Sequence, residues 1–329
     1  MVEQTGYDLI PHIAIHPNQI NIYNTVEWYQ KKRFHPKTAH LVKSNKSTNG
    51  KVSSIANRKI TKAIDYLLLM ANDKKLPSKL HGKVFNFKIS FITLTLPSPQ
   101  CHSDNEIKDK CLNQFIIEAR KKWKVRNYLW RAEKQKNGSI HFHVLVDKFV
   151  PWSELRDVWN RIVNKLGYVE RYRDSMRAFH SGGFHVRENL LQNWDYKHQI
   201  KAYQAGKAND WNSPNSTDVH SIKAVQDVSK YIKKYSTKND ENGTIVGRIW
   251  SCNEELSNIK GAVELVSGDI STELKCVKDL YPNKLYSSDY FSVLHVSINM
   301  LQELKCFFLV QIFSAFLITR FNYNLQLNT

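Results

Sequence analysis

The chain has 329 residues, of which 42% are hydrophobic, and its formal net charge is +18 at pH 7. This length allows one sizeable domain with extensions or two small domains, and it can bury a core. Solubility alone needs far less charge, so a polyanion or an anionic membrane surface is the expected partner. The 8 Trp and 15 Tyr residues favour nucleic acid, because aromatic rings stack on unpaired bases.

The cysteines and the two ends of the chain predict a compartment. The 5 cysteines form no CxxC pair and are odd in number, which favours reduced thiols in a cytosol over a zinc ribbon or disulfides. The first residues include an acidic side chain and no apolar run, which argues against secretion. The apolar run 306–318 is shorter than the roughly 20 residues that span a bilayer, so no stable membrane insertion is expected.

Residues 1–80 are predicted to form a basic, partly helical N-terminal extension. A basic, Ser- and Asn-rich run at 43–54 is typical of an exposed linker. From 54 to 76, apolar residues recur at helical spacing with Lys and Arg between them, which predicts an amphipathic helix.

Residues 81–255 carry alternating strand and helix patterns, and 256–329 are predicted to be a C-terminal extension of unknown role. Ser103 and Glu106 form a capping box at the start of one helix, and Gly167 is expected to end another. The expected elements are strand 85–96, helix 103–123, strands 125–133 and 140–146, helix 151–166, strands 168–172 and 219–223, helix 224–238 and strand 244–252. Their order predicts an α+β fold, a central antiparallel sheet with helices packed on one face.

A long segment without clear periodicity, 173–218, interrupts this pattern. It is rich in Gly, Asn and His, and it includes His180, His185 and His198. Long loops in compact domains are usually functional or mobile. DNA contacts and a lid are both compatible with these residues, and their spacing does not decide between the two.

A His-Phe-His sequence lies in the strand predicted at 140–146. Because side chains alternate along a strand, His141 and His143 lie on one face and Phe142 on the other. Two imidazoles on one rigid surface are half of a metal site, although the same pattern also occurs in ordinary half-buried strands.

Glu133 is the nearest carboxylate that could complete the site, and its orientation depends on the length of the intervening turn. With a two-residue turn at Asn137 and Gly138, Glu133 would pair with Phe142 and point away from both histidines. With a three-residue loop, 136–138, in which Gly138 is left-handed, Glu133 pairs with His141 on the same face. We predict the second arrangement; the alternative is a solvated carboxylate beside Lys134 or Arg131.

The predicted helix 224–238 contains a duplicated YxxK unit. Tyr231 and Tyr235 are four residues apart and so lie on one helix face, and Lys234 and Lys238 follow them at a spacing of three. Five lysines against one aspartate between 223 and 238 suit a phosphate backbone. Two amphipathic tyrosines on a solvated basic helix are the alternative interpretation.

The two motifs complement each other chemically. A phenol with a pKa near 10 is a poor nucleophile at phosphorus unless neighbouring cations favour its ionised form. A metal held by two histidines and a carboxylate would polarise the phosphate under attack. Together they describe a phosphoryl-transfer site.

In order along the chain, the strand 91–95 (FITLT), His141-Phe-His143 and the helix 231–238 (YIKKYSTK) resemble the three motifs of HUH endonucleases. The two-tyrosine form is similar to the rolling-circle replication initiators of small single-stranded DNA phages, the microviruses. The resemblance covers roughly residues 85–250. It implies a ferredoxin/RRM-like core in a viral protein acting in the cytoplasm of a bacterial host.

The resemblance also implies roles for individual residues. His141 and His143 would bind Mg²⁺ or Mn²⁺, Glu133 would occupy the place of the third polar ligand, and Tyr231 and Tyr235 would be the nucleophiles. Lys234 and Lys238 are expected to assist the phenols. The lysines expected to contact nucleic acid are Lys230, Lys233, Lys234 and Lys238.

The implied reaction is nicking and rejoining of single-stranded origin DNA through a 5′-phosphotyrosine intermediate. No GxxxxGK[ST] loop occurs in the chain, so unwinding and synthesis are expected to need a host helicase and polymerase. Three alternatives stay open: a plasmid-type initiator, relaxase or transposase with the same chemistry, a two-His-one-carboxylate metalloenzyme, and a non-catalytic nucleic-acid-binding protein.

Overall fold

The computed structural model describes residues 7–16, 19–28, 52–72, 74–77, 84–222, 243–259, 262–265, 278–279, 282–288 and 291–295. The chain divides into two compact units, one of residues 1–46 and 258–329 and the other of residues 47–257. Among the helices in these ranges, none combines the length and the apolar character needed to cross a bilayer.

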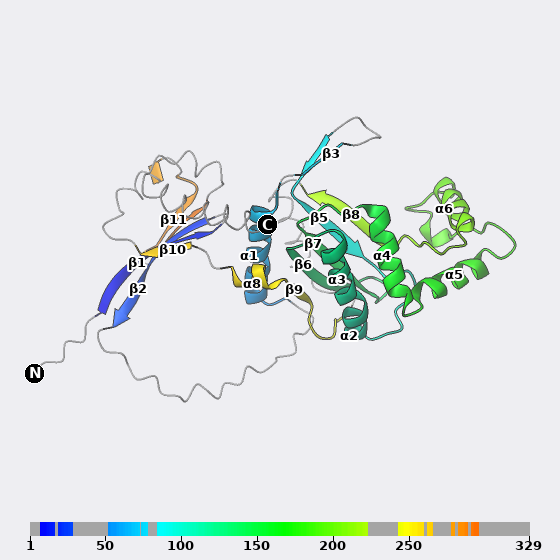
Figure 1. The fold of residues 1–329 in the computed structure, drawn as a ribbon, viewed down its shortest axis with the longest axis horizontal. Helices are drawn as coiled ribbons and strands as arrows, with labels where there is room; N and C mark the ends of the chain where they lie inside the picture. Colours follow the sequence, from blue (N-terminus) through cyan, green and yellow to red (C-terminus); the bar gives the residue numbers. More distant parts are fainter. Residues whose placement is uncertain are drawn as a thin grey trace, which may run out of the picture. The chain divides into compact units, whose positions relative to one another are not determined.

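The second unit is built on a five-stranded antiparallel sheet (Figure 1). In sheet order its strands are β8 (Thr217–Ile222), β5 (Ile89–Leu94), β7 (Ile140–Val146), β6 (Tyr128–Lys134) and β9 (Trp250–Cys252). A helical crossover joins β5 to β6, and β7 returns between them, which is the split βαβ order of ferredoxin-like sheets. The α+β fold with a central antiparallel sheet is therefore confirmed.

The crossover consists of α2 (Asp104–Ile107), a π-helical turn (Lys108–Leu112) and α3 (Asn113–Lys122). The helix begins where the capping box predicts, because the Ser103 hydroxyl accepts a hydrogen bond from the Glu106 amide at 3.2 Å. After β7 the chain forms α4 (Trp152–Asn164), which lies beside α3 across the sheet (Figure 1).

The main core lies between these helices and one face of the sheet. Alternate strand residues supply it, among them Ile92, Phe142 and Val144, and all three are fully buried. The Trp159 ring of α4 meets Phe142 and the Phe115 ring of α3 edge-on, with centroids 6.3 and 5.9 Å apart. The intervening strand residues, including both histidines, therefore occupy the opposite face.

Two predicted elements of this unit differ from the structure. The segment 168–172 is not a strand: it begins α5 (Tyr168–Phe179), because Gly167 with φ +75° turns the chain directly into a second helix. The segment 173–218 is largely ordered, with a 3₁₀ turn (Glu188–Leu190) and α6 (Tyr196–Ala208). Asp195 caps α6 by accepting from the His198 amide at 2.8 Å.

The flanks of the unit also differ in length from the predictions. The amphipathic helix α1 (Ser54–Met70) ends six residues before 76, and β3 (Lys74–Pro77) then pairs with β4 (Val84–Phe87). Of the strand predicted at 244–252 only β9 forms, because Ile245 and Ile249 pack into the core. The short helix α8 (Glu254–Asn258) follows β9. The predicted helix 224–238 lies outside the described residues.

The first unit contains a second five-stranded antiparallel sheet. In sheet order its strands are β10 (Ala262–Leu265), β1 (Tyr7–His16), β2 (Gln19–Trp28), β12 (Phe291–His295) and β11 (Leu285–Ser287). The sequence patterns do not predict β1 and β2, because Pro11 and several polar residues interrupt the alternation and few side chains, such as Ile13 and Ile20, are buried.

Candidate metal centre

The β6–β7 hairpin decides which face Glu133 occupies. The Gln135 amide donates to the Ser139 carbonyl at 2.8 Å, which leaves a three-residue loop, 136–138, with Gly138 at φ +77°. Glu133 lies directly opposite His141 in the ladder. The predicted loop length, left-handed glycine and strand register are all confirmed.

Three ligand atoms converge on this face of the sheet. Glu133 Oε1 lies 2.7 Å from His141 Nε2 and 2.9 Å from His143 Nε2, and the two Nε2 atoms are 3.1 Å apart. The three side chains are 10–14% exposed, so the cluster is shielded but open to solvent on one side. Within the described part of the chain, this is the group of acidic, histidine and cysteine side chains arranged to hold a metal ion.

The spacing of the three atoms suits a divalent cation. If both imidazoles donate to Glu133, their two N–H groups face each other, so protons alone do not satisfy the cluster. In an octahedral site with bonds of roughly 2.1 Å, adjacent ligands are about 3.0 Å apart, whereas a tetrahedral site places them at about 3.4 Å. The observed distances are those of three adjacent octahedral ligands.

The ionisation of the cluster also suits a metal. Burial alone would raise the pKa of Glu133, but hydrogen bonds from both imidazoles lower it to about 2. Burial lowers the pKa of His143 from its ordinary value, against the opposing effect of Glu133. At neutral pH Glu133 is therefore ionised and His143 uncharged, the forms in which these groups bind metal.

The central strand β5 supports the histidines from beside them. Thr93 is paired with His143 in the ladder, and its hydroxyl lies 3.2 Å from His143 Nδ1, the nitrogen that does not face the cluster. The Phe91 ring lies 5.1 Å from the same imidazole. These contacts hold the ring so that Nε2 points to the cluster, as outer partners of metal-binding histidines do. The sequence motif FITLT contains both residues, but it does not indicate their contact with His143.

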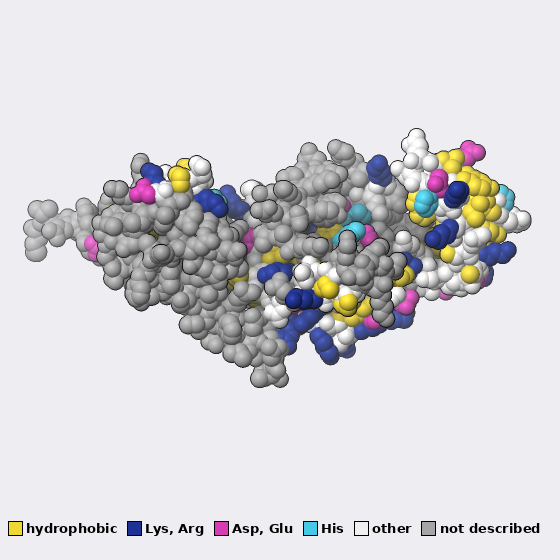
Figure 2. Space-filling model, turned by 90° about the horizontal axis from the view of Figure 1, so that it is seen from above, with side chains coloured by type: hydrophobic (Ala, Val, Ile, Leu, Met, Phe, Trp, Pro, Cys, Tyr) yellow, Lys and Arg dark blue, Asp and Glu magenta, His cyan; other side chains and the backbone are white. Residues whose placement is uncertain are grey.

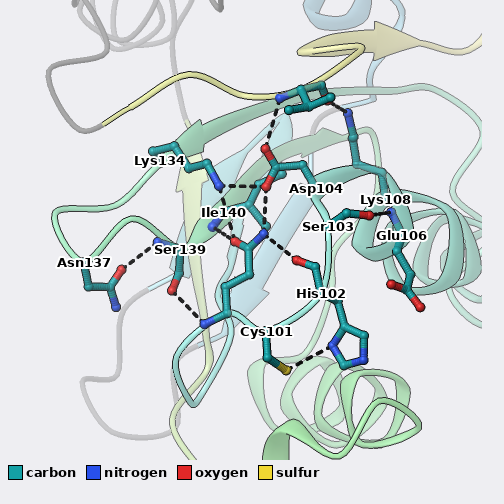
Figure 3. A network of polar contacts seen from close by, with 12 residues as sticks. Cys101, His102, Ser103, Asp104, Glu106, Lys108, Lys134, Asn137, Ser139 and Ile140 are labelled. Atoms are coloured by element: carbon teal, nitrogen blue, oxygen red, sulfur yellow. Dashed lines mark hydrogen bonds and ion pairs between the residues drawn. The ribbon is translucent and has the colours of Figure 1, made fainter.

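A polar network anchors the hairpin to the start of the crossover (Figure 3). Asp104 accepts from Lys134 Nζ and from the Gln100 side-chain amide, both at 2.7 Å, and from the Val246 amide at 3.0 Å. The Gln100 carbonyl oxygen in turn accepts from the Ile140 amide at 2.6 Å. Burial would raise the pKa of Asp104, but these hydrogen bonds and the Lys134 charge lower it. The network thus fixes both strands that carry the ligands.

A lysine extends the same network to the segment before β9. Lys108 Nζ donates to the carbonyls of Val246 and Arg248 at 2.6 and 3.1 Å. Sequence reasoning did not identify Gln100, Asp104 or Lys108, because their partners lie 30 or more residues away and no local pattern marks such pairs.

The tyrosine motif lies outside the described residues, which stop at 222 and resume at 243. The predicted nucleophiles Tyr231 and Tyr235, and the lysines Lys230, Lys233, Lys234 and Lys238, fall in this interval. Their positions relative to Glu133, His141 and His143 stay predictions.

Comparison with known proteins identifies one family. Residues 89–240 match the model of the ORF2 family of replication-associated proteins. The matched segment spans both the histidine pair and the tyrosine motif, and it supports a role as a rolling-circle replication initiator. No curated protein and no solved structure matches the chain.

Proposed function

We propose that this protein starts rolling-circle replication as a metal-dependent endonuclease that nicks and rejoins single-stranded origin DNA. The observation that carries the proposal is the convergence of Glu133, His141 and His143 within the segment that matches the replication-associated family. The net charge of +18 supports binding to a polyanion.

In the proposed reaction, a tyrosine of the YxxK motif is the nucleophile. The phenol oxygen of Tyr231 or Tyr235 bonds to phosphorus, its proton leaves to solvent or a nearby base, and the bond from phosphorus to the 3′ oxygen breaks. The 3′ oxygen takes up a proton and becomes a free hydroxyl that can prime synthesis. Lys234 and Lys238 would favour the ionised phenols, since a nearby positive charge lowers the pKa of an acid.

Glu133, His141 and His143 would hold Mg²⁺ or Mn²⁺, which when bound supplies charge stabilisation to the phosphate under attack. Thr93 would keep the imidazole of His143 in the ligand orientation. The Asp104 network would hold the hairpin, so the ligand atoms need little rearrangement when a cation enters.

Two tyrosines would allow the cycle to close. One holds the displaced strand as a phosphotyrosine ester, the second cuts the regenerated origin, and the released 3′ hydroxyl then attacks the first ester and closes a circle. The ester retains the bond energy of the phosphodiester, so joining needs no ATP.

A microvirus-type, two-tyrosine initiator acting in a bacterial cytoplasm with a host helicase and polymerase is the form we propose. In it residues 81–255 are the nuclease domain, and 1–80 and 256–329 are extensions. A plasmid-type initiator, relaxase or transposase would share the chemistry, and the duplicated YxxK unit favours the phage type.

The test is formation of a covalent adduct between the full-length protein and labelled single-stranded origin DNA in the presence of Mg²⁺ or Mn²⁺. The wild type should form the adduct, and the Tyr231→Phe/Tyr235→Phe double variant should form none, because both proposed nucleophilic oxygens are removed. His141→Ala should abolish the adduct while leaving salt-sensitive DNA binding largely intact.

Two outcomes would refute the proposal. One is a wild-type protein that forms no adduct with either metal. The other is an adduct that persists in the double tyrosine variant, since a metalloenzyme that shares only the His-His-Glu triad needs neither tyrosine.

A further inference from the structure

The lobe formed by α5, α6 and the chain leading to β8 surrounds a cavity of about 650 Å³. Its lining is aromatic and polar, and the permanent cations among the described residues that line it are Arg156 and Arg187, with no aspartate or glutamate. Figure 2 shows hydrophobic side chains gathered at this end of the unit, with histidine and basic side chains beside them. An apolar, ring-lined cavity with positive charge suits a ligand that is flat and anionic.

Four rings of the lining contact one another. The His180 ring is stacked against Trp211 at 5.8 Å and Phe184 at 6.0 Å, with interplanar angles of 10° and 17°, and it contacts Tyr203 at 4.8 Å. All four residues stay partly exposed. Between 170 and 213, only Met176 and Gln199 are buried, so the rings do not form a closed core of the lobe.

The backbone is strained where it places Trp211. Asp210 and Trp211 have φ values of +52° and +53°, a conformation that non-glycine residues rarely adopt. The Trp211 amide donates to the Gly206 carbonyl at 2.8 Å, and its ring lies so close to α6 that a Cβ atom on Gly206 would be 2.3 Å from Trp211 Nε1. Strain of this kind persists where the surrounding structure holds a side chain in a required position.

A second pocket continues from the cavity toward the metal centre. Both are lined by Arg156 and Asn215, and the second pocket extends to Thr93, whose hydroxyl contacts His143. The Arg156 guanidinium donates to Asn215 at 2.9 Å and lies 4.8 Å from the Trp152 ring. One carboxylate, Asp218, lines this pocket, and it lies 2.7 Å from His220 in an ion pair when that imidazole is protonated.

We propose that the cavity binds an unpaired base of the DNA strand whose phosphate lies at the Glu133, His141 and His143 cluster. The base would stack on the ring of Trp211, and Arg156 and Arg187 would contact the phosphates between the cavity and the cluster. This inference rests on the proposed function, and it adds a base-binding site next to the nicking site.

The test separates the binding energy of bases from that of the backbone. Binding of the full-length protein to a labelled 20-nucleotide oligothymidylate and to an abasic strand of equal length is measured by fluorescence anisotropy. Trp211→Ala should weaken oligothymidylate binding by about fivefold or more, the smaller end of the range for one stacked base, and leave abasic-strand binding unchanged. Trp211→Phe should keep most of the preference.

Two further variants control for indirect effects. Gly206→Ala should reduce the preference as Trp211→Ala does, because the added methyl group displaces the Trp211 ring. Tyr196→Ala removes an aromatic ring of the same lobe that does not line the cavity, and it should change neither affinity. If Trp211→Ala loses abasic-strand binding as well, Tyr203→Ala replaces it as the test variant.

The outcomes distinguish this inference from the proposed function. If the wild type forms the covalent adduct but Trp211→Ala and Tyr203→Ala retain the full preference for the strand with bases, the base-binding site is wrong and the nicking function stands. If the wild type forms no adduct, the proposed function fails. A preference that Trp211→Ala removes would then still assign the cavity to single-stranded DNA.

Discussion

Glu133 determines the charge at the centre of the cluster. Its carboxylate oxygen contacts both imidazoles, and these contacts outweigh the cost of burial, so its pKa falls to about 2. His143 is buried beside it with a lowered pKa. Both shifts favour the deprotonated form, which leaves the three ligand atoms ready for a cation at neutral pH.

Acid should therefore destabilise the metal-free protein. Because the folded state holds the Glu133 and His143 protons more weakly than the unfolded chain, the free energy of unfolding should fall as pH decreases. His143 contributes below its ordinary pKa of 6.5, and Glu133 contributes between its ordinary 4.5 and about 2. Complete protonation of Glu133 would remove on the order of 3 kcal/mol. Urea unfolding at a series of pH values in EDTA measures this.

Glu133→Gln is the control for this dependence. It retains the shape of the side chain but does not titrate, so the loss of stability below pH 4.5 should be smaller than in the wild type. An equally steep loss in the variant would assign the acid sensitivity to other groups, such as Asp104, whose pKa is also lowered.

At the scale of elements, two short segments with left-handed glycines position the cluster. The loop of the β6–β7 hairpin contains Gly138, and the segment before β9 contains Gly247, with φ of +77° and +82°. A Cβ on Gly138 would meet nothing within 4 Å, whereas one on Gly247 would lie 2.5 Å from Asn105 Oδ1 and 3.1 Å from Lys108 Nζ. The backbone conformation is similar at both, and only the available space differs.

Alanine at these two positions should therefore have unequal effects. Gly138→Ala should cost about 1 kcal/mol of stability, from the left-handed backbone alone. Gly247→Ala should cost about 2–3 kcal/mol, because the methyl group also displaces Lys108 from the carbonyls that it binds. Denaturant unfolding compares them, and equal losses would contradict the assigned contacts at Gly247.

At the scale of the whole molecule, charge is the property that acts beyond single contacts. A net charge of +18 attracts nucleic acid from a distance, and bound cations are released when lysines and arginines replace them at phosphates. The rings of the aromatic cavity would add contacts to bases that salt affects far less.

Binding to single-stranded DNA should accordingly depend strongly on salt. Contact with about four phosphates would weaken binding by about 50-fold between 50 and 200 mM salt. Anisotropy titrations of oligothymidylate at several salt concentrations measure the slope. Trp211→Ala should lower the affinity without changing that slope, and a slope near zero in the wild type would contradict electrostatic binding.

Local patterns in the sequence determined much of the second unit. The period of two along a strand placed His141 and His143 on one face, and the glycine in the turn predicted the loop length that brings Glu133 to that face. Ser103 and Glu106 marked a helix start. Each of these inferences depends on neighbours within a few residues, where backbone geometry limits the alternatives.

Only the tertiary structure revealed the contacts between distant segments. Asp104 pairs with Lys134, and the rings of His180 and Trp211 stack, although no periodicity links these positions. The first unit pairs β2 with β12, from opposite ends of the chain. Such contacts depend on how the whole chain buries its apolar surface and satisfies its polar groups, which a local pattern does not specify.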